Sequence, residues 1–438
     1  MSSRARVSSW TMPLAFLVGF AAPAAAGNVL VVDAGGGGAF TDIQPAVDAA
    51  VDGDTILVKT GTYGAFAVAD KALAIVGDTG AVVEIGGAVR VYNLSAGKTV
   101  VLESLSTTQS SGGTASRGLY LSDDAGSVRI EGCTFVGATG TIPSHRSGWE
   151  GAFVESCSDV AFTHCQLDGG ENREGYVDGL PNQLPGDGGD ALLVEHSTVV
   201  LHDCTVRGGR GWNGQQATGY DGGWGGHGAE LTDSTLLASA SSFTGANGGW
   251  GDMLHCGGLW FGGSAGYGLR LVGSGSLARL QDCVEIGGTP GCDIGGLCST
   301  YCYPQLPGRS GSTIVDLPTP ARELLQPPTM PVRESTSAYL TYRGQPGDRV
   351  SLYMSTSTQS RFLSAWDGYL LLHPQRPHLM MIVGTIPASG LLTEPLWIRE
   401  LPPLVQSSRL YLQAVFTDAQ GGKHLGGPSS LVILDQQF

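Results

Sequence analysis

Five segments of this chain repeat one pattern of glycine, alternating apolar residues and a polar turn. They are RGLYLSDDAGSVRIEGCTFVG (117–137), EGAFVESCSDVAFTHCQLDGG (150–170), GDALLVEHSTVVLHDCTVRGG (189–209), GHGAELTDSTLLASASSFTGA (226–246) and GYGLRLVGSGSLARLQDCVEIGG (266–288). A unit this short, with apolar residues at every second position, cannot bury its apolar face alone. It must stack on its neighbours, so the repeats predict a solenoid.

The spacing of apolar residues identifies the kind of solenoid. Each segment alternates with a period of two and has no apolar residues at helical spacing. Strands of three to five residues, separated by Gly, Ser and Asp turns, are typical of a β-coil. We therefore predict an all-β parallel β-helix, in which insertions of varied length leave one corner of each coil.

A short helix is expected to cover the first coil. TDIQPAVDAAVDGD (41–54) places Ile43, Val47 and Val51 four residues apart, and Thr41 with Gln44 has a capping-box pattern. An uncovered terminal coil would offer free strand edges, so a cap is physically required.

The opening of the chain adds a resemblance to a known group of proteins. GGGGAFTDIQPAVDAAVDGDTILVKTGTY (35–63), followed by IVGD (75–78), resembles the start of right-handed parallel β-helix proteins of the pectin-lyase-like superfamily, and the pectinesterase branch is closest in wording. The resemblance implies a right-handed β-helix over residues 27–302 and an extracellular polysaccharide as the setting. It does not supply catalysis, because the DFIFG motif of pectinesterases is missing. Gly226-His227-Gly228 also lacks the Asp-rich motif that precedes Gly-His-Gly by one coil in polygalacturonases.

Residues 1–26 are predicted to be a secretory signal peptide. They combine Arg4 and Arg6, an apolar core at 10–20 and small residues at 24–26. Their removal would change the formal net charge from −15 to −17, because both arginines leave and no acidic residue does. Such a charge argues against nucleic acid and anionic membranes as partners. We expect a secreted monomer without membrane insertion, with association to a cell surface as an alternative.

The composition changes near residue 303. Seven prolines mark residues 303–331 as a linker of extended character. Residues 332–438 contain strand-like stretches of a non-repetitive kind, separated by turns such as PGD and GGP, and they predict an antiparallel β-sandwich module.

The cysteines fall into two groups. Cys133, Cys165, Cys204 and Cys283 occupy the same place in four of the five repeats, so we expect an internal ladder of small apolar side chains. Four others lie in loops and are predicted to form two disulfides in a secreted chain, with a zinc site as an alternative; they are Cys256, Cys292, Cys298 and Cys302.

The insertions between repeats are the expected location of function. They occupy 141–149, 173–188, 212–225 and 249–265, are rich in Gly and irregular, and should form one wall. Aromatic rings stack on sugar faces, and carboxylates accept hydroxyl hydrogen bonds, so we predict a polysaccharide groove; the alternative is that the tryptophans pack under the loops. The predicted binding residues are Trp212, Trp224, Trp250, Trp260, Asp221, Asp252 and Tyr267.

Alignment of the repeats exposes a candidate catalytic set. Glu150, Asp190, His227 and Tyr267 each precede the first strand of a repeat, so they should lie about 4.8 Å apart in one column. Neighbouring carboxylates push one pKa upward, which leaves an acid beside a base for glycosidic hydrolysis or for proton abstraction in a lyase. A row of polar residues at a solvent-facing corner is the alternative. No cofactor is required by this chemistry, although Asp187 and Asp190 suggest calcium.

Two classes of function follow. The first is a secreted protein that binds, and in its enzymatic form degrades, polysaccharide as a lyase or a glycoside hydrolase. The second is a non-catalytic structural or adhesion protein of the cell surface.

Overall fold

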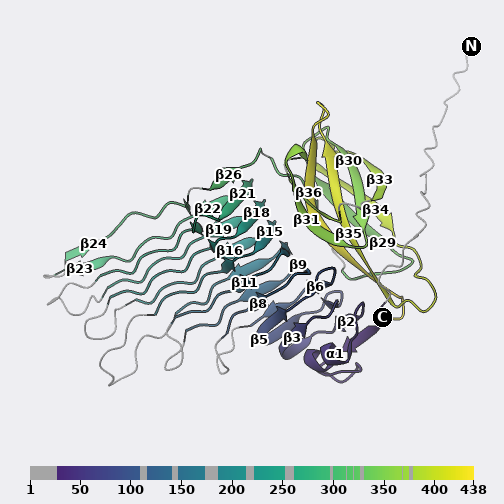
Figure 1. The fold of residues 1–438 in the computed structure, drawn as a ribbon, viewed down its shortest axis with the longest axis horizontal. Helices are drawn as coiled ribbons and strands as arrows, with labels where there is room; N and C mark the ends of the chain where they lie inside the picture. Colours follow the sequence, from purple (N-terminus) through teal and green to yellow (C-terminus); the bar gives the residue numbers. More distant parts are fainter. Residues whose placement is uncertain are drawn as a thin grey trace, which may run out of the picture.

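The computed structural model describes most of the chain after the predicted signal peptide, which lies outside the described residues. The described ranges are 27–108, 116–140, 147–172, 186–213, 221–251, 261–295, 299–311, 313–318, 320–325, 330–366, 368–373 and 378–438. Figure 1 shows a long stack of parallel strands and a separate C-terminal domain beside it.

Each sequence repeat forms one coil of three short strands. The first strands are β8 (Leu119–Ser122), β11 (Ala152–Glu155), β14 (Leu192–Glu195), β17 (Ala229–Thr232) and β20 (Leu269–Val272). The second strands are β9 (Ser127–Glu131), β12 (Asp159–Thr163), β15 (Thr198–His202), β18 (Thr235–Ser239) and β21 (Leu277–Gln281). The third strands are β10 (Thr134–Val136), β13 (Gln166–Asp168), β16 (Thr205–Arg207), β19 (Ser242–Thr244) and β22 (Val284–Ile286).

Less regular coils precede the repeats. Their strands are β1 (Val29–Val32), β2 (Thr55–Val58), β3 (Gly61–Ala69), β4 (Ala74–Gly77), β5 (Val83–Tyr92), β6 (Thr99–Glu103) and β7 (Ser106–Thr107). The second strands of the repeats belong to a 10-stranded sheet that begins with β1, β2, β4 and β6. The first and the third strands belong to a 14-stranded sheet, in which β5 connects the two series. Neighbouring coils pair in parallel, so the predicted right-handed parallel β-helix is confirmed.

Left-handed residues turn the chain at the corners of each coil. Between the first and second strands, Asp123, Ser156 and His196 have φ of 56°, 54° and 48°; between the second and third, His164 has φ 53°. Non-glycine residues adopt this region at a cost, and short polar side chains adopt it most readily. The Ser, Asp and His residues at the sequence turns therefore set the length of each strand.

The interior is an apolar stack with a cysteine ladder. Phe135, Leu167 and Phe243 are fully buried in equivalent third strands. Cys133, Cys165 and Cys204 are buried and free, and Cys283 is partly buried and free, so the predicted ladder without disulfides is confirmed.

Helix α1 (Ile43–Ala49) covers the first coil, as predicted, but with a different cap. Asp42, not Thr41, is the N-cap residue, and its Oδ1 accepts from the N–H of Ile43 at 2.8 Å. Gln44 bonds the backbone of Ala67 instead of closing a capping box, because the neighbouring strand β3 offers it an amide at 2.7 Å. Val51 falls beyond the helix and is exposed.

The β-helix continues beyond residue 302. Strands β25 (Arg309–Ser310) and β26 (Ile314–Asp316) add a last layer by pairing with β20 and β21, so part of the predicted linker 303–331 belongs to the solenoid. In this layer Glu285, Arg309 and Asp316 stand opposite the core residues Phe243, Leu269 and Leu280. Arg309 bonds Asp316 at 2.9 Å and lies 3.6 Å from Glu285. Charged residues thus replace apolar ones where the core ends.

The C-terminal domain is a β-sandwich with one shared core. Its three-stranded sheet contains β27 (Glu323–Leu325), β29 (Ser337–Arg343) and β34 (Leu391–Trp397). Its five-stranded sheet contains β28 (Val332–Arg333), β30 (Arg349–Ser355), β33 (His378–Thr385), β35 (Ser407–Thr417) and β36 (Lys423–Leu434). A hairpin of β31 (Thr358–Leu363) and β32 (Gly368–Leu372), joined by a 3₁₀ turn at Ser364–Trp366, extends from it. Tyr342 and Phe416 are fully buried between the sheets.

The sandwich packs on the outer face of the 10-stranded sheet. Leu57, Val76 and Val101 of the β-helix form one buried cluster with Tyr411 and Val432 of the sandwich. Figure 1 shows β36 and β35 facing the strands of the early coils. Because both faces of these β-helix strands are covered, stretches such as TILV in β2 are buried at every residue. Within the described residues, no helix is long and apolar enough to cross a membrane.

Candidate functional site

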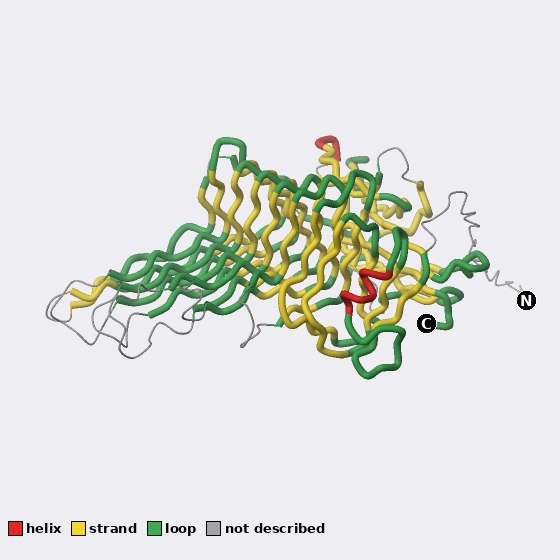
Figure 2. Tube along the Cα trace, turned by 60° about the horizontal axis from the view of Figure 1, so that its bottom comes forward, coloured by secondary structure: helices red, strands yellow, loops and turns green. Residues whose placement is uncertain are grey.

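The described parts of the insertions form a regular two-layer array. Outgoing segments (137–140, 169–172, 208–213, 245–251, 287–292) leave the third strands, and incoming segments (147–151, 186–191, 221–228, 261–268) lead to the next first strands. Figure 2 shows them as parallel loops that project from one corner of the β-helix. We call this structure the glycine array. Its regularity corrects the prediction of irregular loops.

Three-residue periodicity organises each segment of the array. In Asp221-Gly-Gly-Trp224-Gly-Gly-His227 the glycines are buried and the other three side chains point outward. Gly222 and Gly225 donate to the carbonyls of Phe261 and Ser264 on the next coil, both at 2.8 Å. An extended chain with three residues per turn, rising about 3.1 Å per residue, places every third side chain on one face.

Glycine is required because the two layers touch through their backbones. Gly170, Gly189, Gly209 and Gly226 form a hydrogen-bonded series across the layers, each N–H donating to the preceding carbonyl at 2.8 or 2.9 Å. A Cβ on Gly189 would lie 2.2 Å from the carbonyl oxygen of Trp149. The close approach of the layers therefore explains much of the content of 68 glycines.

Outward carboxylates complete the hydrogen bonding of the array. Oδ1 of Asp187 accepts from the N–H of Trp224 at 2.7 Å, and Oδ1 of Asp221 accepts from the N–H of Phe261 at 2.7 Å. Asp190 accepts from the N–H of His227 in the same way, at 2.5 Å. Each carboxylate thus binds the amide one coil further on, which gives it a structural role. Among the described residues, no group of three or more His, Cys, Asp or Glu side chains could hold a metal ion.

The structure brings the predicted catalytic set together in one column. Gly151 donates to the carbonyl of Asp190 and Ala191 to that of His227, both at 3.0 Å, so Glu150, Asp190 and His227 occupy equivalent places in consecutive coils. Tyr267 extends the column by one coil, and its ring stacks on that of His227 with centroids 5.8 Å apart.

Arg117 begins this column, and the sequence analysis missed it. Its Nε lies 2.8 Å from Oε2 of Glu150. Its guanidinium lies over three aromatic rings, 4.7 Å from the centroid of Phe153, 5.2 Å from that of Trp149 and 5.4 Å from that of Tyr120. The alignment of the repeats contained this signal, because Arg117 precedes the first strand of the first repeat just as Glu150 precedes the first strand of the second. Glu150 is therefore paired rather than free to act as a base.

Asp190 is the residue of the column with an unusual acidity. Its pKa is raised to about 7, chiefly by burial and also by the charges of Glu230 and Glu150, although the N–H of His227 and the charge of Arg270 oppose the rise. A carboxyl with this pKa is half protonated near neutral pH and can exchange a proton there.

His227 is neutral and its ring nitrogens are occupied. Burial lowers its pKa to about 4, and the nearby Arg270 contributes. Its Nδ1 accepts from the N–H of Tyr267 at 2.8 Å, so in the neutral ring Nε2 carries the proton. This nitrogen lies between Nη1 of Arg270, 3.1 Å away, and Oε2 of Glu230, 3.4 Å away. Arg270 also pairs with Glu230, at 2.9 Å. This geometry leaves His227 without a lone pair for a substrate proton.

The predicted binding residues have different environments. Trp224 is 63% exposed on the incoming layer, and Asp221 is exposed three residues before it. Trp250 and Tyr267 are partly buried, whereas Trp212 is only 9% exposed, and its backbone bonds those of Gly186 and Gly223. Trp260 and Asp252 lie outside the described residues. Phe261, which is 57% exposed beside Asp221, was not among the predicted binding residues. Its three-residue spacing to Ser264 and Tyr267 is the sequence signal that indicates an outward position.

One disulfide closes the last outgoing segment. It joins Cys292 to Cys302 and flanks the hairpin of β23 (Asp293–Gly295) and β24 (Ser299–Tyr301). The predicted partners Cys256 and Cys298 lie outside the described residues.

Comparison with known proteins yields similarity at the level of solved structures. No family model and no curated protein matches the chain. Among solved structures, pectate lyase Pel9A is 12% identical over 66% of this chain and 80% of its own, with a TM-score of 0.27. Tailspike protein 2 of Escherichia coli O157:H7 bacteriophage CAB120 is 10% identical over 94% and 64%, with a TM-score of 0.22. The A-module of the Azotobacter vinelandii mannuronan C-5 epimerase AlgE6 is 11% identical over 64% and 95%, with a TM-score of 0.14.

These scores are low, so the fold assignment depends on the strand pairing of the chain itself. Parallel coils in register through five sequence repeats, stacked on an apolar interior, define it. The protein is a right-handed parallel β-helix with a glycine array on one corner and a C-terminal β-sandwich on one face.

Proposed function

We propose that the chain binds extracellular polysaccharide through the outward face of the incoming layer. The observation that carries the proposal is the pair of exposed rings Trp224 and Phe261, which stand among the carboxylates Asp187 and Asp221 on a rigid backbone. Aromatic rings supply apolar area to the faces of pyranose rings, and carboxylates accept hydroxyl hydrogen bonds. Such rings on a monomeric surface are typical of a binding site.

The layout of this face suits a chain-like ligand. Outward side chains recur about 4.8 Å apart from coil to coil and about 9 Å apart along each segment. Phe261 lies on the coil after that of Trp224, beside Asp221, which is three residues before Trp224. The two rings are therefore offset both from coil to coil and along the segment. A polymer that lies across the coils would meet both rings.

The charge of the face favours a neutral or amine-bearing glycan over a polyuronate. The incoming segments 186–191, 221–228 and 261–268 contain no Lys or Arg but contain Asp187, Asp190 and Asp221. Two arginines beside the column are already paired, Arg117 with Glu150 and Arg270 with Glu230. A polyanion would meet carboxylates without compensating cations.

Removal of the exposed rings should weaken this binding. Trp224→Ala and Phe261→Ala are each expected to lower affinity about tenfold, or about 1.4 kcal/mol, because each removes a stacking surface without touching the backbone of the array. Affinity electrophoresis and titration calorimetry over a panel of neutral, amine-bearing and acidic polysaccharides measure it. Trp397→Ala is the matched control, because this ring is 61% exposed on the sandwich. Unchanged affinity in both Trp224→Ala and Phe261→Ala would contradict binding at the proposed face.

A second candidate function is cleavage of the bound glycan by proton transfer, favoured by the pKa of about 7 at Asp190. Asp190→Asn should then lower the rate of fragment release by about 100-fold or more while binding persists, because the amide keeps the oxygen that accepts from His227 but cannot exchange a proton. Mass spectrometry of the products separates unsaturated lyase fragments from hydrolysis products. If the unmodified protein leaves every polymer intact, cleavage is contradicted. The function would then be non-catalytic, either binding or adhesion at a cell surface.

We also propose that the protein is secreted as a monomer. The support is the charge and apolar pattern of residues 1–26 and the last coil, where Arg309 pairs with Asp316 and places charged side chains at the end of the core. N-terminal sequencing of the exported protein tests the cleavage after residue 26.

A further inference from the structure

A buried row of polar side chains lies between the β-helix and the sandwich. Glu103, Glu131, Thr163, His202 and Ser239 occupy one register position on successive second strands, on the outer face of the 10-stranded sheet. The sandwich covers this row, and Glu103, Glu131 and His202 are each at most 3% exposed. Titratable groups in such a place are costly unless paired or neutral.

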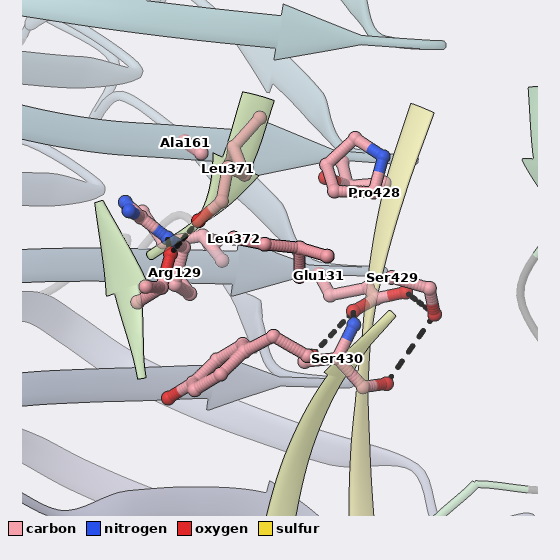
Figure 3. A pocket seen from close by; sticks show the side chains of 12 residues that line it. Arg129, Glu131, Ala161, Leu371, Leu372, Pro428, Ser429 and Ser430 are labelled. Atoms are coloured by element: carbon pink, nitrogen blue, oxygen red, sulfur yellow. Dashed lines mark hydrogen bonds between the residues drawn. The ribbon is translucent and has the colours of Figure 1, made fainter. Parts of the chain in front are cut away.

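Two of these groups are carboxyls on neighbouring strands. Glu131 accepts from the N–H of Ser430 at 2.7 Å and from Oγ of Ser429 at 2.9 Å, both on β36. Figure 3 shows it at the junction of the domains, in a narrow crevice that Arg129, Leu371 and Pro428 also line. Glu103, one strand away, has no hydrogen-bond partner for either carboxyl oxygen among the described residues.

Burial of this pair is compatible with at least one proton. Burial raises the pKa of Glu103 well above its usual value, and the neighbouring Glu131 raises it further. Burial also raises the pKa of Glu131, although the Ser430 and Ser429 hydrogen bonds oppose this. Two buried carboxylates about one strand spacing apart repel each other, and the hydrogen bonds of Glu131 assign the proton to Glu103.

His202, in the same row, is buried in its unprotonated form. Its Nδ1 lies 2.7 Å from Oγ of Ser239, and its ring packs against Gly427 of the sandwich, where no Cβ would fit. Burial lowers its pKa to about 3, with His164 and Arg343 contributing. Docking therefore requires the neutral imidazole.

Other charged groups around the row are already paired. Arg129 of β9 bonds Asp159 of β12 at 2.6 Å and Oγ1 of Thr358 in β31 at 2.8 Å, which ties both β-helix strands to the hairpin of the sandwich. Arg343 bonds Glu323 at 2.6 Å. His164 faces Glu131 and lies 3.6 Å from Asp203.

We propose that the sandwich docks on the β-helix through a proton-controlled latch, closed while the Glu103–Glu131 pair keeps a proton and His202 is neutral. When both carboxyls ionise, their repulsion inside the buried interface separates the domains. The outer face of the 10-stranded sheet, including Leu57 and Val101, then becomes accessible.

The direction of the pH dependence follows for each group. The raised pKa of Glu103 means that its contribution is fully present below the ordinary value of 4.5 and is lost as pH rises through the raised value. The lowered pKa of His202 means that its contribution is fully present above 6.5 and declines as pH falls toward 3. The latch is therefore expected to be tightest in mildly acidic solution and to open as the pH rises.

Small-angle scattering of the full chain from pH 4 to pH 10, with limited proteolysis of the domain connection, tests the latch. We expect a compact particle near pH 6 and a larger, protease-sensitive one at alkaline pH. Glu103→Gln should stay compact to higher pH, because an amide cannot ionise, whereas Glu400→Gln, at an exposed carboxyl, should follow the unmodified protein. His202→Gln should lose the decline on the acidic side.

Three outcomes would overturn the proposal. A particle that is equally compact from pH 5 to pH 10 would show that no latch opens. An unchanged midpoint in Glu103→Gln would place the titrating group elsewhere. Closure at alkaline pH by added calcium chloride would mean that a cation, not a proton, neutralises the pair.

Discussion

Replacing Gly427 with Ala is expected to detach the sandwich from the β-helix. A Cβ at this position of β36 would lie 1.9 Å from Nε2 of His202 and 2.0 Å from its Cδ2. The His202 ring cannot easily turn aside, because it is 1% exposed and Nδ1 lies 2.7 Å from Oγ of Ser239. The backbone of Gly427 is not left-handed, so the effect would come from the contact and not from the conformation of residue 427.

The size of the effect and its cause can be measured separately. Overpacking of a well-packed interface costs about 1–3 kcal/mol, and more where neighbours cannot move. Calorimetry should show a lowered melting temperature for the sandwich, and scattering should show an enlarged particle. The double variant Gly427→Ala/His202→Ala should recover the compact form, since it removes the opposing ring. A single variant that is as compact and stable as the unmodified protein would contradict the docked arrangement.

The coils were predictable because their signal is local and repeated. Alternation with period two fixes which side chains face inward, and a slip of one residue would turn Phe135 and its equivalents outward. The Gly before each first strand, and the Cys (Ser241 in the fourth repeat) after each second strand, fix the register between repeats. The same alignment predicts that Glu150, Asp190 and His227 share one column, and the backbone hydrogen bonds between their coils place them there.

The glycine array was not predictable by the same reasoning. Periods of two and 3.6 residues indicate strands and helices through buried side chains, but the array buries glycine, which has none. The three-residue period of DGGWGGH (221–227) was visible, yet without a buried side chain it looked like a loop. The exposure of Trp224 and the burial of Trp212 follow from that period.

The docking of the sandwich on the β-helix could not be predicted from the sequence either. The stretches TILV (55–58) and TVVLE (99–103) are buried at nearly every residue, which indicates a strand covered on both faces. Nothing in them identifies the covering surface, because the contacts to β36 join residues about 300 positions apart. Glu103 and His202 are polar residues at outward positions, and only the docked sandwich makes them buried.

Replacing Gly249 with Ala is expected to unfold the glycine array around it. A Cβ there would lie 1.6 Å from the carbonyl oxygen of Trp212, which is backbone and cannot move without breaking its bond from Gly223. Gly249 both donates to Gly223 and accepts from Gly263, so one added methyl group disrupts two layers at once. We expect a loss of about 4–5 kcal/mol, at the upper end of single substitutions.

Two matched variants separate the close contact from a general effect of losing glycine. Gly86→Ala in β5 places its Cβ no closer than 3.5 Å to any atom and should leave the melting temperature nearly unchanged. Ser264→Ala alters an outward position of the array and should also be tolerated. If Gly249→Ala melts like these controls, the layers are not in backbone contact. If it melts early and also loses glycan binding with Trp224 intact, the binding face depends on the array that carries it, because a ring can stack on a polymer only while the backbone holds it in register with its neighbours.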